Sequence, residues 1–299
     1  MATEKNKIDA KHEEPQVESI SEKELEKIES VVQGKPVGPE SAVSEAVKAW
    51  KPKTSLGKKV VSGEVNDLGA VLDRGEKILE AEIVDMLIPN LQNDLLLIGQ
   101  ARGKFGGGQR RVFKTTQKKT KKGNKPKFST CAVVGNADGF VGIGFGKSIE
   151  TVPSRDKAIK RAKLNIMKIR RGCGSWKCNC GEPHSIPYQI GGKCGSAEIL
   201  IMPAPKGTGL KVEKECAKIL KLAGIKDAWS KTRGQTGTKI NLVEACYQAL
   251  KNLTSTKVKE EYFEKLGITD GPLKSKTEDH EFMKSMKVKS GKTTGEAEE

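Results

Sequence analysis

The sequence predicts an α+β protein built from two successive modules, with a polar tail at each end. The first observation is an apolar pair of strand-like segments within residues 128–145, followed by a helical segment that begins near Pro153. The second is that residues 195–255 repeat this combination of strand-like and helical segments. The third is the polar composition of the two ends, which contain few large apolar residues.

The two ends of the chain have too few large apolar residues to predict a core. Residues 1–50 predict a mobile arm. Residues 51–93 predict an extended lead-in that packs on a partner, with little evidence for a fold of its own. Residues 256–299 predict a polar tail with at most a short helix near 262–266.

The first module is expected over residues 94–172. Residues 128–134 and 140–145 are apolar, and the Gly- and Asn-containing segment between them predicts a turn, so the pair predicts a hairpin. A helix is expected from residue 153 to about residue 171. Its sheet-facing residues should be those that recur at helical spacing, Ile159, Ala162, Ile166 and Ile169.

A Cys- and Gly-rich loop at residues 173–194 separates the first module from the second, which is expected over 195–255. The second module should contain strands at 195–204 and 225–232 and helices near 212–224 and 242–253.

Positive charge is concentrated in one quarter of the chain. The 299 residues include 54 Lys and Arg against 38 Asp and Glu, for a net charge of +16. Residues 99–172 hold 20 of these cations and only 3 of the acids, whereas residues 1–98 have a net charge of −6. Such a cationic segment indicates a polyanionic partner, and the absence of an amphipathic lipid-seeking helix there favours nucleic acid over a membrane.

The sequence argues against membrane and secreted classes. Its densest apolar stretches, residues 83–88 and 95–98, are far shorter than the roughly 20 residues of a spanning helix. The first residues lack the apolar stretch of a secretory signal. Seven cysteines, an odd number, favour reduced thiols or metal ligands, so we expect a cytoplasmic protein.

The Gly- and Arg-rich loop at residues 101–111 is the strongest candidate for contact with RNA. Its glycines allow the backbone to approach a phosphate strand, and Arg102, Arg110 and Arg111 can clamp phosphates. Phe105 can stack on an unpaired base. The alternative is a flexible, solvated basic loop. The Lys-rich segment 114–127 is less specific and predicts an arm that is disordered until RNA orders it.

Two further groups of cations are RNA candidates. The first lies in the opening turns of the helix that begins near Pro153, where the helix dipole adds positive potential. The second, Lys231 and Arg233, is expected in a loop after a strand. The alternatives are an ordinary solvated helix face and plain turn chemistry. The complete candidate set is Arg102, Lys104, Phe105, Arg110, Arg111, Lys114, Lys118, Lys119, Lys121, Lys122, Lys147, Arg155, Lys157, Lys160, Arg161, Lys231 and Arg233.

Residues 142–148 resemble the end of a nucleotide-binding P-loop, but the spacing excludes one. The motif needs glycine at the position that Val141 occupies. These glycines instead predict a strand whose lack of side chains at these positions allows the following helix to pack closely on it. No grouping of an activated nucleophile with a base, or of paired acids, predicts acid–base or covalent catalysis, so neither an enzyme nor a small-molecule substrate is expected.

The loop at 173–194 offers up to five soft metal ligands. Cys173, Cys178, Cys180 and His184 can hold zinc, with Cys194 as an alternative fourth ligand. Zinc with four protein ligands would brace the loop and have no open position for catalysis. The spacing is not that of paired Cys-x-x-Cys motifs, so reduced thiols remain the alternative.

Several motifs together resemble the small-subunit ribosomal protein five family. In chain order they are Gly107-Gly-Gln-Arg-Arg-Val-Phe113, Val133-Val-Gly-Asn136, Gly139-Phe-Val-Gly-Ile-Gly-Phe-Gly-Lys147, Pro183-His-Ser-Ile-Pro187, Gly207-Thr-Gly-Leu210 and Ala223-Gly-Ile-Lys-Asp-Ala-Trp-Ser-Lys-Thr-Arg-Gly-Gln235. The loop Gly172-Cys-Gly-Ser-Trp-Lys-Cys178 and the lead-in resemble the archaeal type of this family.

The resemblance covers about residues 50–255. It implies an N-terminal module like a double-stranded-RNA-binding domain, followed by a second α+β module. It also implies a structural role in the small ribosomal subunit, against rRNA and near the region where mRNA enters, with ribosomal proteins four and eight as neighbours and a contribution to decoding accuracy. The first 50 residues, the Lys-rich segment and the long C-terminal tail depart from the family pattern. The alternative function is a free-standing double-stranded-RNA-binding factor in RNA processing.

Overall fold

The computed structural model describes residues 50–88, 90–100 and 110–273. The predicted N-terminal arm, the Gly-rich part of the basic loop and the last part of the predicted tail lie outside these residues. Within them, no helix combines the length and the apolar character needed to span a membrane.

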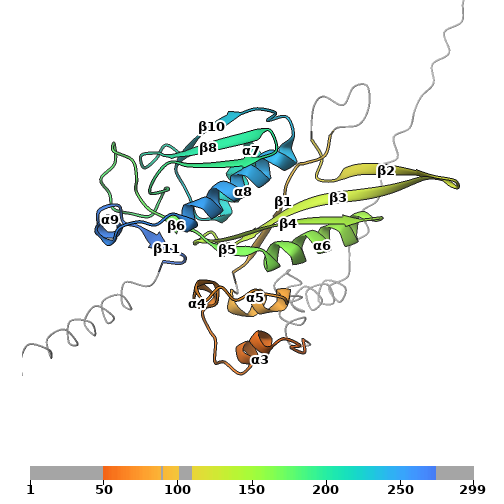
Figure 1. Ribbon diagram of the computed structural model, residues 1–299, viewed down its shortest axis with the longest axis horizontal. Helices are drawn as coiled ribbons and strands as arrows, with labels where there is room; N and C mark the ends of the chain where they lie inside the picture. Colours follow the sequence, from red (N-terminus) through yellow and green to blue (C-terminus); the bar gives the residue numbers. More distant parts are fainter. Residues whose placement is uncertain (1–49, 89, 101–109, 274–299) are drawn as a thin grey trace, which may run out of the picture. The chain divides into compact units, whose positions relative to one another are not determined.

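The first module is an antiparallel sheet covered on one face by helix α6 (Thr151–Leu164) (Figure 1). The strand order is β1-β3-β4-β5, and β2 pairs with the distal part of β3. The bounds are β1 (Gln92–Leu95), β2 (Lys114–Thr120), β3 (Gly123–Gly135), β4 (Phe140–Ser148) and β5 (Ile166–Lys168). The predicted hairpin is therefore confirmed as β3 and β4. In its turn, the Asn136 side chain accepts hydrogen bonds from the backbone N–H groups of Asp138 and Phe140.

Glycines on β4 allow α6 to lie directly on the sheet. A Cβ atom at Gly142, Gly144 or Gly146 would overlap backbone atoms of α6. The residues of α6 that face these glycines are small and buried: Ser154, Ala158 and Ala162. A larger side chain would not fit, because the helix lies directly against the strand backbone. This close packing confirms the role predicted for these glycines.

Helix α6 is shorter than predicted, and the assignment of Ile166 and Ile169 to it is wrong. The helix ends at Leu164, and the backbone N–H of Asn165 caps it by donating to Arg161 and Ala162. Ile166 then pairs with Gly142 as part of β5, and Ile169 lies between strands. Both isoleucines are buried, but they reach the core from extended backbone. Their spacing fits a helix by coincidence.

The lead-in is helical rather than extended, which corrects the prediction for residues 51–93. It forms the short helices α3 (Ser55–Val61), α4 (Leu68–Asp73) and α5 (Ala81–Leu87). Thr54 and Asp67 cap the first two by accepting hydrogen bonds from backbone N–H groups. Helix α5 packs against α6, and Asp85 on α5 forms an ion pair of 2.6 Å with Lys163 on α6. The lead-in thus packs on its own chain.

The Lys-rich segment is an ordered hairpin, contrary to the expected disordered arm. Strand β2 pairs with β3 from Lys114↔Ser129 to Thr120↔Gly123. The turn is tight, and Gly123 supplies a positive φ of 110° that other residues rarely adopt. Threonines in β2 favour extended backbone despite the charge around them. We call β2 with residues 123–129 of β3 the basic arm.

The second module is a four-stranded sheet in the order β7-β8-β10-β9, with helices that complete its core. Its elements are β7 (Ile190–Cys194), β8 (Ala197–Pro203), β9 (Leu210–Lys211), α7 (Lys214–Leu222), β10 (Ala228–Arg233) and α8 (Lys239–Ser255). One hydrophobic cluster contains residues from both sheets and both helices, so the two modules share a core. The strand predicted at 225–232 begins three residues later than expected.

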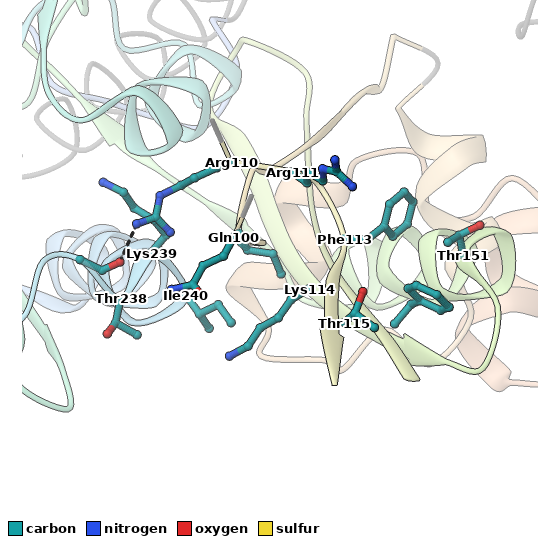
Figure 2. A pocket seen from close by; sticks show the side chains of 13 residues that line it. Gln100, Arg110, Arg111, Phe113, Lys114, Thr115, Thr151, Thr238, Lys239 and Ile240 are labelled. Atoms are coloured by element: carbon teal, nitrogen blue, oxygen red, sulfur yellow. Dashed lines mark hydrogen bonds between the residues drawn. The ribbon is translucent and has the colours of Figure 1, made fainter. Parts of the chain in front are cut away.

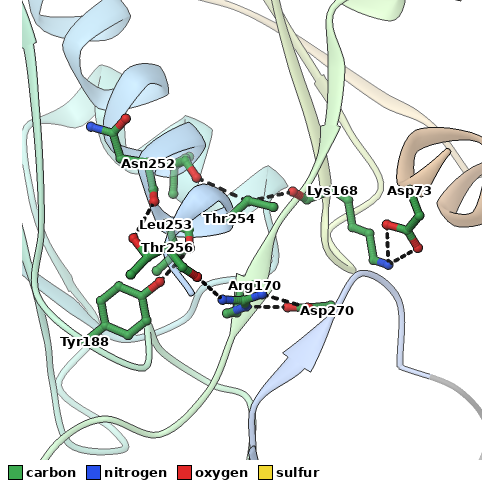
Figure 3. Close-up of polar contacts among 10 residues, drawn as sticks. Asp73, Lys168, Arg170, Tyr188, Asn252, Leu253, Thr254, Thr256 and Asp270 are labelled. Carbon is green, nitrogen blue, oxygen red and sulfur yellow. Dashed lines mark hydrogen bonds and ion pairs between the residues drawn. The ribbon is translucent and has the colours of Figure 1, made fainter. Parts of the chain in front are cut away.

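Residues 256–273 return to the first module, so the prediction of a polar tail from residue 256 is wrong for this part. Helix α9 (Glu260–Lys265) matches the expected short helix. Strand β11 (Thr269–Asp270) then pairs antiparallel with β6 (Arg170–Arg171). Asp270 forms an ion pair of 2.7 Å with Arg170, whose guanidinium also donates to the carbonyl of Thr256 (Figure 3). Hydrogen bonding to Asp270 raises the pKa of Arg170 further above its usual range.

The last residues of the predicted α6 are therefore not a solvated basic face. Arg170 is buried against Asp270, and Arg171 is buried and pairs with Asp138 at 2.5 Å. Lys168 forms an ion pair of 2.8 Å with Asp73 of the lead-in, as Figure 3 also shows. These cations hold three distant segments of the chain together.

Candidate RNA-binding surface and metal centre

The basic arm presents one face of exposed lysines. Side chains two residues apart on a strand share a face, as do directly paired residues of neighbouring strands. The register pairs Lys118 with Lys125, Thr116 with Lys127 and Ser129 with Lys147. One face of the sheet therefore carries what we call the lysine face: Lys114, Lys118, Lys125, Lys127 and Lys147, all exposed.

The lysine face lies on the side of the sheet opposite α6. Thr130 and Gly146, which are paired, point toward α6, so the alternate positions point away from it. Among the described residues, none forms an ion pair with these five lysines. Like charges directly opposite one another, such as Lys118 and Lys125, destabilise a hairpin on its own. The arrangement is therefore suited to an external polyanion.

A cleft of about 520 Å³ lies where the basic arm meets the start of α8. Arg110, Arg111 and Lys114 line it together with Lys239 at the first position of α8 (Figure 2). Arg110 donates a hydrogen bond of 3.0 Å to the carbonyl of Gly237, and Lys239 pairs with Glu213 at 2.9 Å. Arg111 and Lys114 are exposed and form no ion pair with any residue that the structure describes.

The other predicted cations are distributed over several surfaces. Arg155, Lys157, Lys160 and Arg161 are exposed on α6, on the side of the sheet away from the lysine face. Arg155 pairs with Asp156 at 3.3 Å, and Arg161 donates to the carbonyl of Phe145. Lys119 points to the α6 side of the arm, and Lys121 and Lys122 form its tip.

Five of the predicted RNA-contact residues lie elsewhere than expected or outside the described residues. Lys231 and Arg233 lie within strand β10 and not in a loop after a strand, which corrects the expectation; both are exposed. Arg102, Lys104 and Phe105 lie outside the described residues. Lys125 and Lys127 were missed as site residues, because the sequence predicts no hairpin there and only the register of β2 with β3 places them on the same face as Lys118.

The Cys-rich loop brings four predicted metal ligands together. The ligand atoms of Cys173, Cys178, Cys180 and His184 all lie within 4.8 Å of one another. Cys178 Sγ and His184 Nε2 are 3.8 Å apart. Two ligands bound tetrahedrally to one zinc ion at about 2.0–2.3 Å are separated by roughly 3.6 Å, so the spacing fits. Cys194 is not part of the cluster, which removes it as the alternative fourth ligand.

The electrostatics of the cluster also suit a cation. Backbone N–H groups, above all that of Lys206, stabilise the thiolate of Cys178 and lower its pKa to about 6. Burial, together with hydrogen bonding to the neighbouring thiols, raises the pKa of Cys173 to about 11. A cation would relieve the cost of deprotonating the second thiol by supplying the missing positive charge.

Asp227 orients His184, one of the four candidate ligands, and was not found from the sequence. Its Oδ2 lies 2.8 Å from His184 Nδ1, and both side chains are buried. Its Oδ1 accepts a hydrogen bond of 2.7 Å from the backbone N–H of Gly209. With a proton held on Nδ1, the lone pair of His184 Nε2 points toward the cysteines. In zinc sites, the ring nitrogen of histidine that does not bind the metal usually donates a hydrogen bond to a carboxylate, a carbonyl or water, as His184 Nδ1 can to Asp227.

Comparison with known proteins decides the family. Residues 112–170 match the model described as ribosomal protein S5, N-terminal domain, and residues 192–271 match ribosomal protein S5, C-terminal domain. The small ribosomal subunit protein uS5 of Nanoarchaeum equitans is 45% identical over 77% of this chain and 99% of its own length. The chain belongs to the ribosomal protein S5 family. The uS5 protein of Methanocaldococcus jannaschii is 46% identical over 74% of this chain and 95% of its own length.

Membership of the S5 family confirms the resemblance, including its archaeal type. The protein is therefore a structural, non-enzymatic protein of the small ribosomal subunit and belongs to the cytoplasmic ribosome. The alternative of a free-standing RNA-processing factor is not favoured. A sheet covered on one face by α6 is consistent with the double-stranded-RNA-binding-like module expected of the S5 N-terminal domain. The C-terminal match extends to residue 271 and so includes β11.

Proposed function

We propose that this S5 protein binds rRNA through the lysine face of the basic arm and the adjoining cleft. The observation that carries the proposal is the register of β2 with β3, which gathers five unpaired lysines on one face. Residues two apart on a strand are about 6.8 Å apart, so neighbouring lysines of this face can each contact a phosphate of their own. Lys119, Lys121 and Lys122 extend the positive surface around the tip.

The cations on α6 and β10 are proposed as separate RNA contacts. Lys157 and Lys160 are exposed on α6, and Lys231 and Arg233 are exposed on β10. Because α6 and the lysine face lie on opposite sides of the sheet, one RNA helix cannot contact both; the protein would hold two RNA segments apart at a fixed distance. That is a structural role, in agreement with the family.

The lysine face is tested by a charge-matched comparison. The variant K118Q/K125Q/K127Q removes three lysines from this face, and K58Q/K59Q/K77Q removes three exposed lysines from the lead-in. Binding of each full-length protein to deproteinised small-subunit rRNA is measured over a series of salt concentrations. We expect the arm variant to reduce the slope of log affinity against log salt by about two, because each phosphate contact contributes roughly 0.7–0.9. An equal change in both variants would contradict the proposal.

We also propose that the cluster Cys173, Cys178, Cys180 and His184 holds a structural zinc ion. The short mutual distances of the four ligand atoms and the support of His184 by Asp227 favour zinc over free thiols. Zinc would brace the loop between the two modules, and four protein ligands would leave it no catalytic position. Metal analysis of the purified protein should find one equivalent of zinc, and none in Cys178→Ser. Absence of zinc from the unaltered protein would refute the site.

The family resemblance supports a more detailed place in the small subunit. We propose neighbours in ribosomal proteins four and eight and a position near the region where mRNA enters, with a contribution to decoding accuracy. Cross-linking of intact small subunits, followed by mass spectrometry, should recover links from this chain to both neighbours. Links only to other proteins would contradict this placement.

A further inference from the structure

Trp176 is the most exposed of the large hydrophobic side chains that the structure describes. The residue is 96% exposed, whereas the next, Leu79 and Ile149, are each 69% exposed. It lies at the tip of a tight turn in which the N–H of Cys178 donates to the carbonyl of Ser175 at 3.0 Å. Trp176 and Lys177 occupy the two central positions of that turn. A tryptophan is seldom left in water, because its indole carries a large apolar area.

The backbone beneath Trp176 is held on both sides. Ser175 is buried, and a Cβ at Gly174 would overlap the carbonyl of Pro187. The N–H of Cys173 donates to the carbonyl of Leu266 at 2.7 Å. The exposed ring is therefore presented by a fixed turn and is not a side effect of a loose loop. A ring presented in this way loses little conformational entropy when it binds a partner.

The exposed residues next to Trp176 in the sequence are polar or cationic rather than apolar. Lys177 follows it and is exposed, and Asn179 is exposed two residues further on. The exposed acid of this loop, Glu182, is paired with Lys206 at 2.6 Å. An apolar protein partner would require further apolar groups around the ring, and the neighbours Lys177 and Asn179 provide none. A flat aromatic ring followed by an exposed lysine instead matches a nucleobase with its phosphate.

We infer that Trp176 stacks on an unpaired base of rRNA, while Lys177 contacts a phosphate of the same strand. This inference rests on the proposed rRNA binding, but it names a site far along the chain from the basic arm and a different kind of contact. The arm recognises the charge of the backbone, whereas Trp176 recognises the face of a base that is not paired.

The test compares Trp176→Ala and Trp176→Phe in the full-length protein, with Leu79→Ala as a control for loss of an exposed apolar side chain. Binding to deproteinised small-subunit rRNA is measured over a series of salt concentrations. Stacking on one base predicts that Trp176→Ala weakens binding roughly 5- to 150-fold and that Trp176→Phe retains most of the affinity. The salt slope should not change, because no charge is removed. Leu79→Ala should bind as the unaltered protein does.

A second measurement separates RNA from protein as the partner. Quenching of tryptophan fluorescence by acrylamide is compared in the unaltered protein and in Trp176→Phe, so that the difference reports Trp176. Protection of Trp176 by rRNA alone supports the inference. Unchanged affinity of Trp176→Ala overturns it, and so does protection that appears only in assembled subunits, which would identify a protein partner. Because the lysine-face variants report the salt slope, failure here leaves the proposed arm contact standing.

Discussion

Replacing Asp227 by Asn should weaken zinc binding without removing any ligand. The carboxylate uses both oxygens, one toward His184 Nδ1 at 2.8 Å and one as acceptor for the N–H of Gly209 at 2.7 Å. An amide has only one acceptor oxygen. If that oxygen remains on Gly209, the amide NH₂ faces Nδ1, and the imidazole proton moves to Nε2, the atom that must bind the metal.

The size of the effect follows from the loss of one buried, charge-assisted hydrogen bond. Such a bond contributes about 1.5–3 kcal/mol, which corresponds to roughly a 10- to 150-fold change in affinity. Loss of a carboxylate behind a zinc-bound histidine commonly costs about 10- to 100-fold, in agreement. Zinc affinity is measured by competition with a chromophoric chelator at neutral pH, on the unaltered protein and on Asp227→Asn.

Glu182→Gln provides the matched control. Glu182 also carries a negative charge in the loop, but it is exposed and pairs with Lys206 instead of a ligand. We expect its zinc affinity to stay within about two-fold of the unaltered protein, because an exposed ion pair contributes little. If Asp227→Asn also stays within two-fold, or if Glu182→Gln loses as much, the reasoning that Asp227 orients the ligand is refuted.

Three further predictions concern stability. Gly146→Ala should destabilise the fold by about 1–3 kcal/mol in urea unfolding, because its Cβ would overlap the backbone of α6. Gly191→Ala is the control: its Cβ meets only ordinary contacts, so it should change the free energy of unfolding by less than about 0.5 kcal/mol. Asp270→Ala should cost on the order of 2 kcal/mol, since it leaves Arg170 buried without its counter-ion; an unchanged urea midpoint would contradict this. Burial raises the pKa of Tyr247 to about 12 from its usual 10, so its stabilising contribution is complete below pH 10 and is lost as the pH rises to 12. Tyr247→Phe should therefore flatten the loss of stability in that window, and an identical pH profile would count against it.

Patterns of residues that are close in sequence predicted the structural features that depend on nearby residues. The β3–β4 hairpin was found because its apolar runs flank a Gly- and Asn-rich turn, and three of the metal ligands lie within eight residues. The helical spacing of Ile166 and Ile169 wrongly predicted that they belong to α6. The helix ends at its cap, Asn165, and Ile166 pairs with β4 as part of a strand. The high density of lysines in the basic arm wrongly predicted disorder. The alternation of residues along this segment fits a strand, and the segment pairs as one.

Contacts between distant residues were beyond the reach of such patterns. Asp227 lies 43 residues after His184, and nothing in either segment indicates that they meet. The pairing of β6 with β11 joins residues about 100 positions apart through two-residue strands, which are too short to show any period. In both cases the partners are brought together by the tertiary fold, which no local pattern in either segment encodes.

The return of β11 to β6 also has a consequence for how the chain is made. A ribosome synthesises Arg170 and Arg171 about 100 residues before Asp270, so nascent chains must carry this part of the first module without its last strand. Until Asp270 emerges, Arg170 has no counter-ion and keeps its water, which opposes closure of the module at that edge. Docking of this strand therefore requires synthesis of the chain through Asp270. A chain that ends before Asp270 would therefore retain an unpaired strand edge with an uncompensated arginine there.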